Sequence, residues 1–257
     1  MTAATSTAGV GGDIVLETRG LSVNFGGLKA VDEVDIKVRR GGITSIIGPN
    51  GAGKSTFYNL VTGAIRPSAG TVLLEGRDIT GMPTHKLTAL GLSRSFQITN
   101  LFPESTVFEN LRLAAQVLEP WSRSLLPAWR SGIAEAKAES LIGRFGLAAK
   151  ATELAGHLSH GEQRRLEIAV ALACEPRILI LDEPTQGMSH TDTEEASRMV
   201  RDLGRDMTVV LIEHDIDIVM DLSHTVIVLA QGRKLAEGAP AEVRANKDVQ
   251  TAYFGAH

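Results

Sequence analysis

A glycine-rich segment near the start of the chain carries residue types that bind phosphate. The segment reads Gly48-Pro49-Asn50-Gly51-Ala52-Gly53-Lys54-Ser55-Thr56 and directly follows the apolar run Ile43–Ile47. Glycines let backbone N–H groups turn inward around phosphate oxygens, and the helix predicted over 56–62 adds its positive N-terminal end. The Lys54 ammonium would reach the outer phosphates of a nucleotide, and the Ser55 hydroxyl would bind Mg²⁺. A plain connecting turn is the alternative, which the strand before and the helix after the segment disfavour.

Two adjacent carboxylates follow another apolar run. Ile178–Leu181 is succeeded by Asp182 and Glu183, at the carboxyl end of a strand, where open α/β sheets bind their ligands. Asp182 would hold Mg²⁺, directly or through water, and Glu183 would act as the general base that polarises an attacking water. Paired acids after a strand are often only a solvated turn. Their place downstream of the phosphate loop, on what we predict to be a neighbouring strand, favours the catalytic interpretation.

The hydrophobic patterns indicate two kinds of sheet and therefore an α/β fold. Alternation over residues 21–25 and 34–38 predicts antiparallel strands with one buried face. Short continuous apolar runs over 178–181, 209–212 and 226–229 each follow a helical stretch. That succession is typical of a parallel sheet covered by helices on both faces.

The domain organisation follows from where these patterns stop. The strand signal vanishes between about 99 and 157, where we expect an inserted helical subdomain. The small, polar residues 1–13 predict a flexible tail, and 14–257 predict a single domain.

Composition limits the partners and the compartment. The chain has 26 basic and 30 acidic residues, a net charge of −4, which argues against a nucleic-acid partner because phosphate backbones are bound by basic surfaces. A single cysteine, Cys174, cannot form an internal disulfide and favours a reducing compartment. No apolar run approaches the roughly 20 residues that span a bilayer. We therefore expect a cytoplasmic protein, unless a partner holds it at a membrane.

A third segment of interest begins an amphipathic helix. Ser159, His160 and Gly161 precede a stretch whose residues Leu166, Ala169, Val170 and Ala173 share one face. Taken alone, Ser159 is simply a helix N-cap, although a hydroxyl and a glycine at a helix start also suit a second anion site. The phosphate loop, Gln97, this segment, the acidic pair and His214 follow one another as in ABC ATPases, and the resemblance covers nearly the full chain.

The resemblance implies a fold and a two-chain mechanism. The expected architecture is the P-loop NTPase fold of ABC ATPases, with a mainly parallel sheet core, an N-terminal antiparallel β subdomain and the inserted α-helical subdomain. Ser159 and Gly161 of the signature loop would contact the γ-phosphate of ATP bound by a second cassette, identical or related. The two chains would thus sandwich two ATP molecules. His214 would be the switch histidine that contacts the γ-phosphate.

Two further positions take roles from the same resemblance. Gln97, in the run 93–97, is similar to the loop glutamine that touches Mg²⁺ and communicates with membrane subunits. Phe25, followed by two glycines, stands where an aromatic ring stacks on adenine. Stacking needs only a π-face, so phenylalanine should serve and GTP should be accepted weakly. A core aromatic within a strand is the alternative for Phe25.

Three positions depart from the pattern of the family. His160 stands where many relatives have glycine, Glu162 where many have glutamine, and Ser189 where many have the aspartate of the loop after the acidic pair. These changes spare the expected phosphate contacts and put the strength of coupling between the two chains in question.

The nearest resemblance is to ATP-binding subunits of importers for branched-chain amino acids and their relatives for amides and urea. It is carried by the stretches 96–103 with 106–111, 164–169 and 249–255. Lipopolysaccharide-extraction ATPases share several of these features, and the longer segment 113–133 favours the importers. Trp121 and Trp129 lie there and would either anchor a membrane subunit or pack the subdomain. The arginine pairs 39–40 and 164–165 are predicted to be solvated.

The importer resemblance implies transmembrane permease subunits as partners and, indirectly, a solute-binding protein. It also implies a peripheral location on the cytoplasmic face of the cell membrane. A soluble ABC ATPase without a transporter is an alternative, but the chain has one phosphate loop and no sustained heptads. A small-molecule P-loop kinase is another, and it would have no use for the second phosphate site at Ser159.

Overall fold

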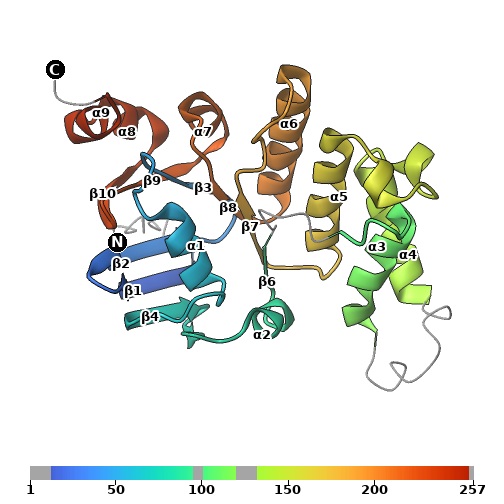
Figure 1. Cartoon of the computed structure of the whole chain (residues 1–257), viewed down its shortest axis with the longest axis horizontal. Coiled ribbons are helices and arrows are strands. Elements are labelled where there is room, and N and C mark those ends of the chain that lie inside the picture. The colour runs from blue at the N-terminus through green and yellow to red at the C-terminus, as the bar shows by residue number, and fades with distance from the viewer. Residues whose placement is uncertain (1–12, 95–100, 120–131, 255–257) are drawn as a thin grey trace, which may run out of the picture.

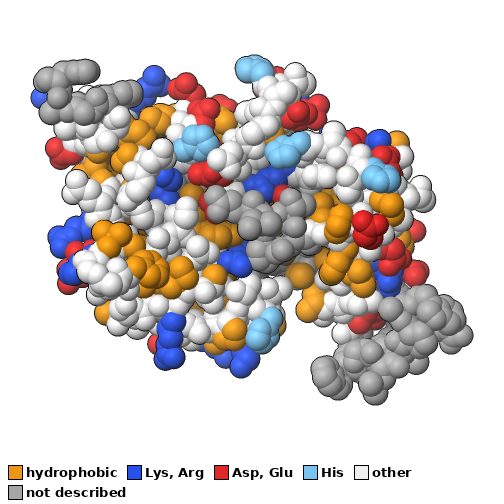
Figure 2. Space-filling model, in the orientation of Figure 1, with side chains coloured by type: hydrophobic (Ala, Val, Ile, Leu, Met, Phe, Trp, Pro, Cys, Tyr) orange, Lys and Arg blue, Asp and Glu red, His pale blue; other side chains and the backbone are white. Residues whose placement is uncertain are grey.

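The computed structural model describes residues 13–94, 101–119 and 132–254. Within them the chain forms two sheets surrounded by helices, with a helical region to one side (Figure 1). The described chain opens at Asp13, whose carbonyl accepts a hydrogen bond from the Arg40 amide at 2.9 Å. Basic and acidic side chains are interspersed over the face of the described molecule seen in Figure 2.

The first sheet is antiparallel and four-stranded, in the order β2-β1-β4-β5. Its strands are β1 (Ile14–Phe25), β2 (Leu28–Arg39), β4 (Ala69–Leu74) and β5 (Arg77–Asp78). Along β2, the buried residues Val34, Ile36 and Val38 alternate with exposed neighbours, which confirms the predicted one-sided burial. The apolar face of this sheet packs on the helix that follows the phosphate loop.

The second sheet has six strands in the order β10-β9-β3-β8-β7-β6, and only β10 is antiparallel to its neighbour. They are β3 (Gly42–Ile47), β6 (Leu92–Arg94), β7 (Ile178–Asp182), β8 (Thr208–Ile212), β9 (Thr225–Ala230) and β10 (Arg233–Gly238). The predicted fold class, a mainly parallel core beside an antiparallel N-terminal sheet, is confirmed.

One prediction about this sheet is wrong. The strand before the acidic pair, β7, does not neighbour β3, because β8 lies between them. Hydrophobic periodicity identifies strands, whereas their order in space depends on how the connecting helices cross the sheet. The three carboxyl ends still meet at one edge, since Ile46 and Asp182 both pair with Ile212.

Helices cover the second sheet. They are α1 (Lys54–Val61), α2 (Thr84–Ala89), α5 (His160–Leu172), α6 (His190–Asp206), α7 (Ile216–Leu222), α8 (Pro240–Ala245) and α9 (Lys247–Phe254). Helix α1 begins two residues earlier than the predicted 56–62, because left-handed Gly53, with φ +95°, serves as its N-cap. Among the described residues, no helix is both long enough and apolar enough to cross a bilayer.

The inserted region is helical, as predicted. It contains α3 (Val107–Ala115), α4 (Gly132–Arg144) and the 3₁₀ turns Gln116–Leu118, Ala148–Lys150 and Ala155–His157. Helix α5 lies between α3 and α4 on one side and the second sheet on the other (Figure 1). It is consequently buried on more than the one predicted face: Ile168, Ala171 and Leu172 are buried too, and Val170 is only half-buried.

Candidate active site

The phosphate loop, residues 48–53, joins β3 to α1 and is held by close backbone contacts. A Cβ on Gly48 would stand 2.2 Å from the Leu229 carbonyl oxygen, and one on Gly53 would stand 2.4 Å from the Ala30 carbonyl oxygen. Both positions therefore require glycine. The Gly232 amide donates to the Ala52 carbonyl at 3.0 Å, so β2 and the β9–β10 turn together fix the loop.

The remaining loop residues differ in exposure. Ala52 is buried, Pro49 is half-buried, and Asn50 and Gly51 are exposed. Gly51 has φ +78°, and a Cβ built there would meet nothing within 4 Å. The exposed backbone of the loop is thus accessible to a ligand.

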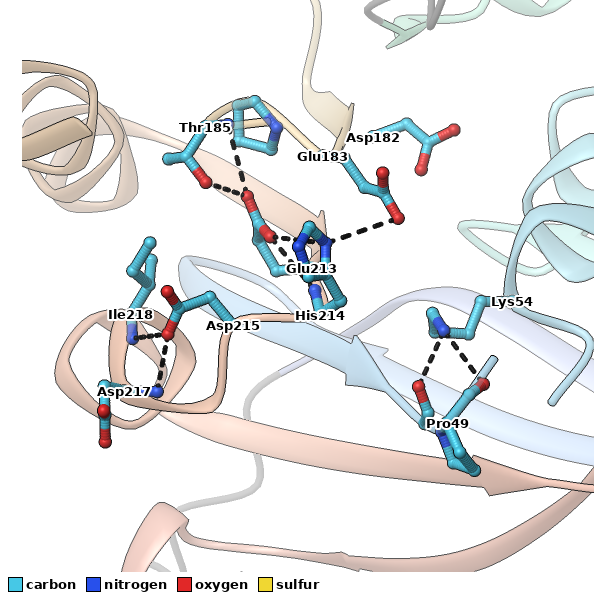
Figure 3. Close-up of polar contacts among 12 residues, drawn as sticks. Pro49, Lys54, Asp182, Glu183, Thr185, Glu213, His214, Asp215, Asp217 and Ile218 are labelled. Atoms are coloured by element: carbon cyan, nitrogen blue, oxygen red, sulfur yellow. Dashed lines mark hydrogen bonds and ion pairs between the residues drawn. The ribbon is translucent and has the colours of Figure 1, made fainter. Parts of the chain in front are cut away.

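Lys54, the first residue of α1, is buried at 7% exposure beneath the loop. Its Nζ donates to the carbonyl oxygens of Gly48 at 2.7 Å and Pro49 at 3.2 Å, as Figure 3 shows. Burial lowers the pKa of Lys54, and the nearby carboxylates of Glu183 and Asp182 act in the opposite direction. The ammonium therefore lies within electrostatic reach of both acids. Next in α1, Ser55 is exposed and Thr56 is half-buried.

The acidic pair lies at the end of β7. Asp182 is buried, and burial followed by the adjacent Glu183 carboxylate raises the pKa of Asp182 to about 6. Glu183 has a left-handed backbone, with φ +44°, and its amide donates to the Ile212 carbonyl at 2.8 Å. The Glu183 side chain remains 15% exposed, which leaves its carboxylate accessible from the edge of the sheet.

The end of β8 brings a histidine to the same edge. His214 Nδ1 lies 3.6 Å from a carboxylate oxygen of Glu183 and 3.6 Å from one of Glu213 (Figure 3). The imidazole is 52% exposed, whereas Glu213 is fully buried. The structure thus brings together Lys54, Asp182, Glu183 and His214 as the sequence led us to expect.

Glu213 and Thr185 were not predicted to matter, yet they fix this edge. The Glu213 carboxylate accepts hydrogen bonds from the Thr185 hydroxyl, the Thr185 amide at 3.2 Å and the His214 amide at 3.0 Å. The turns after β7 and β8 are therefore tied to each other. The signal available in the sequence was an acid directly after the apolar run 209–212.

The predicted signature segment starts α5. Ser159 is the N-cap: its Oγ accepts from the Glu162 amide at 3.4 Å, and the Glu162 carboxylate accepts from the Ser159 amide at 2.9 Å. That backbone hydrogen bond, ahead of other causes, lowers the pKa of Glu162. Ser159 is exposed and Gly161 is half-buried. A Cβ on Gly161 would stand 2.9 Å from a carboxylate oxygen of Asp192, so a larger residue there would displace the Asp192 side chain.

Two of the residues that depart from the family pattern, His160 and Ser189, lie at the starts of helices. His160 is exposed. Ser189 is the N-cap of α6, accepting from the Asp192 amide at 3.3 Å and donating to its carboxylate at 2.6 Å. Serine therefore has a structural role here that does not depend on a partner.

The expectation that residues 164–165 are solvated is wrong for Arg164. Its side chain is 11% exposed, and it donates to the carbonyl oxygens of Asp182 at 2.6 Å and Glu183 at 3.0 Å. The sequence could not predict this burial, because the carbonyl groups that Arg164 binds belong to residues 18 and 19 positions further along the chain.

Phe25 ends β1 with 49% of its surface exposed, so it is not a core aromatic. It pairs across the hairpin with Leu28, which is 68% exposed. Gln97, Trp121 and Trp129 lie outside the described residues.

A phosphate loop between a parallel strand and a helix, with acids on the same edge of the sheet, defines a P-loop nucleotide hydrolase. A family model described as "ABC transporter" matches residues 31–186, and one described as "Branched-chain amino acid ATP-binding cassette transporter" matches residues 233–257. The chain belongs to the ABC transporter family, as one of its ATP-hydrolysing cassettes.

Curated relatives match along nearly their full length. The chain is 41% identical over 249 residues to the high-affinity branched-chain amino acid transport ATP-binding protein LivG of Salmonella typhimurium, covering 94% of this chain and 98% of LivG. It is 42% identical over 250 residues to BraF of Pseudomonas aeruginosa, described in the same words, with the same coverage. The lipopolysaccharide export system ATP-binding protein LptB of Haemophilus influenzae is 30% identical over 242 residues, covering 94% and 97%.

Solved structures agree on the fold. A nucleotide-free ATP-binding cassette from an ABC transporter superposes with a TM-score of 0.81 at 32% identity, covering 95% of this chain and 100% of that one. A dimeric cassette in a post-hydrolysis state, bound to ADP and phosphate, has a TM-score of 0.73 at 25% identity, covering 88% and 98%.

Proposed function

We propose that this chain binds and hydrolyses ATP to energise an importer of branched-chain or related amino acids or amides. Support for the site comes from one observation above all: Lys54, Glu183 and His214 converge on the edge of the sheet where the phosphate loop ends. Support for the substrate class comes from the identity of 41–42% to LivG and BraF, against 30% to LptB. Lipid extraction is therefore the second candidate.

The residues would divide the reaction as follows. Phe25 stacks on adenine, backbone amides of residues 48–53 surround the β- and γ-phosphates, and Lys54 neutralises their charge. The Glu183 carboxylate accepts a proton from the attacking water. His214, fixed through the Glu213 hydrogen bonds, contacts the γ-phosphate from the neighbouring strand end.

The donor set also fits Mg²⁺. A hard cation takes oxygen ligands, and the exposed Ser55 hydroxyl and the Asp182 carboxylate supply them, with Gln97 as a third candidate. The pKa of Asp182 is raised by burial and by Glu183, so a nearby cation would restore the charged form. When bound, Mg²⁺ would neutralise charge on the phosphate oxygens.

The partners follow from the exposed start of α5. By resemblance to ABC ATPases, Ser159 and Gly161 would grip the γ-phosphate held by a second cassette, and the similar cassette solved as a dimer with ADP and phosphate supports such pairing. Hydrolysis removes the shared phosphate, and the clamp opens. Permease subunits would receive this motion near Gln97 and the helical subdomain, holding the chain at the cytoplasmic face of the membrane. A solute-binding protein would deliver the solute.

Reconstitution tests this function. The chain, co-expressed with permease subunits and a receptor of a branched-chain amino acid importer, is placed in liposomes, and ATP-dependent uptake of labelled leucine and of labelled acetamide is measured. We expect uptake of at least one, lost in Glu183→Gln. ATPase activity that responds only to lipopolysaccharide would favour the extraction function.

A further inference from the structure

Arg164 connects α5 to the turn that carries the acidic pair. Its guanidinium donates to three successive carbonyl oxygens: Asp182 at 2.6 Å, Glu183 at 3.0 Å and Pro184 at 3.2 Å. A fourth contact is its ion pair with Glu167 at 2.7 Å, in which the two side chains are only 11% and 10% exposed. The planar fork of the guanidinium suits several acceptors at once, which a lysine ammonium does not.

The turn that Arg164 holds contains an unfavourable conformation. Glu183 has φ +44°, a left-handed backbone that is uncommon and energetically unfavourable for a residue with a Cβ. On one side, the Glu183 amide is held by the Ile212 carbonyl at 2.8 Å. On the other, Arg164 holds the carbonyls. Because backbone conformation decides where a side chain starts, these contacts aim the Glu183 carboxylate.

We propose that Arg164 is a positioning residue for ATP hydrolysis, which holds Glu183 in the conformation that directs its carboxylate at the attacking water. This inference rests on the proposed function of Glu183 as general base. Arg164 lies on the same helix as the signature loop that begins at Ser159. Helix α5, whose start would contact the partner's ATP, therefore also positions the general base Glu183 of its own chain. One rigid helix thus links the two sites.

Steady-state ATPase kinetics of the full-length chain test this role. Arg164→Met keeps the length of the side chain and removes its donors, and Arg164→Lys keeps the charge with a single ammonium. Arg165→Met is the matched control, because the adjacent Arg165 pairs with Glu195 at 3.2 Å and makes no hydrogen bond to the acidic turn among the described contacts. We expect kcat to fall about 10- to 100-fold in Arg164→Met, since misplacing a catalytic group is that costly.

The KM for ATP should stay within about twofold of the wild-type value, because a loss confined to kcat marks an interaction that acts on the transition state. The kcat of Arg164→Lys should lie between those of the wild type and Arg164→Met. The kcat of Arg165→Met should match that of the wild type. Methylguanidinium chloride should restore part of the kcat of Arg164→Ala and none of that of Glu183→Gln, which separates positioning from misfolding.

Three results would overturn the positioning role: a raised KM with unchanged kcat in Arg164→Met, equal losses in Arg165→Met, or no rescue of Arg164→Ala. A wild-type chain that hydrolyses no ATP would instead overturn the proposed function itself.

Discussion

At the residue scale, the carboxyl ends of β7 and β8 bring several carboxylates close together. The Asp182 carboxylate lies within electrostatic range of two other carboxylates, Glu183 and the buried Glu213, and of the cations Lys54 and Arg164. Carboxylates brought together in a site of low polarity disfavour one another's charged forms. The arrangement is unfavourable for the isolated chain and suited to a site that receives a divalent cation.

Asp182→Asn should stabilise the chain in the absence of nucleotide and Mg²⁺. The pKa of Asp182 is about 6 in the folded state, against about 3.9 in an unfolded chain. Ionised Asp182 therefore destabilises the folded state at neutral pH, and this effect fades as the pH falls from about 6 to about 4 and is gone by about pH 3, where both states are protonated. At pH 7.5 the asparagine variant should be more stable by about 3 kcal/mol.

Urea denaturation at pH 7.5 and pH 4 measures this difference. We expect the gap in unfolding free energy at pH 7.5 to shrink toward zero at pH 4. An asparagine variant less stable than the wild type at pH 7.5 would mean that the Asp182 charge is already compensated. Its Mg²⁺-dependent ATPase activity should be lost in either case.

Lys54→Ala should lose nucleotide affinity, because it removes the cation that the loop holds beside the phosphates. Direct titration with ATP, by calorimetry, should show a Kd raised at least about tenfold, since hydrogen bonds to charged groups contribute about 1.5–3 kcal/mol. Lys137→Ala is the control. Lys137 lies on α4 of the helical subdomain and pairs with Glu175, so this variant should bind ATP with wild-type affinity. Equal affinity in both variants would argue against the phosphate-loop assignment.

At the scale of elements, α5 is the helix on which the two parts of the molecule meet. Leu166 is fully buried in the cluster that includes Leu111 of α3 and Leu181 of β7. Leu166→Ala should therefore cost about 3 kcal/mol of unfolding free energy, within the range for a buried leucine that leaves a cavity. Leu113→Ala, on α3 at 36% exposure, is the matched control and should cost less than about 1 kcal/mol.

Chemical denaturation of both leucine variants gives the two values directly. A cost at Leu166 no greater than that at Leu113 would mean that α5 is not the structural link between the helical subdomain and the sheet.

Much of the fold could be predicted from the sequence because its signals are local. The alternation along β2 and the continuous apolar runs of β7, β8 and β9 report burial of each strand separately. Strand order could not be predicted, because hydrophobic periodicity carries no information on which strands are neighbours. In the structure, β8 lies between β3 and β7. The one-sided pattern assumed for α5 missed its second buried face, which includes Ile168 and Leu172, because burial on two sides depends on the helical subdomain packing against α5 from elsewhere in the chain.

The site shows the same division. The phosphate loop and the acidic pair were readable because each is contiguous and its residue types follow from phosphate and Mg²⁺ chemistry. Glu213 and Arg164 were not, because their partners are distant in sequence: Thr185 lies 28 residues before Glu213, and Pro184 lies 20 residues after Arg164. A fully buried glutamate is recognisable only once the hydrogen bonds that satisfy it are seen.

At the scale of the whole molecule, the proposed function has each chain contribute half of each of two sites. The phosphate loop and the acids lie on the sheet, and the exposed signature segment lies at the start of α5. In the proposed dimer, one γ-phosphate is shared between Lys54 of one chain and Ser159 of another. Closure should therefore depend on ATP and not on ADP, which lacks that phosphate.

The most direct measurement is sedimentation velocity of the Glu183→Gln variant, alone and co-expressed with a related cassette. With ATP and Mg²⁺, we predict a particle with the mass of two cassettes, which returns to single chains with ADP and which Ser159→Arg prevents. Single chains under every condition, despite measured ATP binding, would contradict the account.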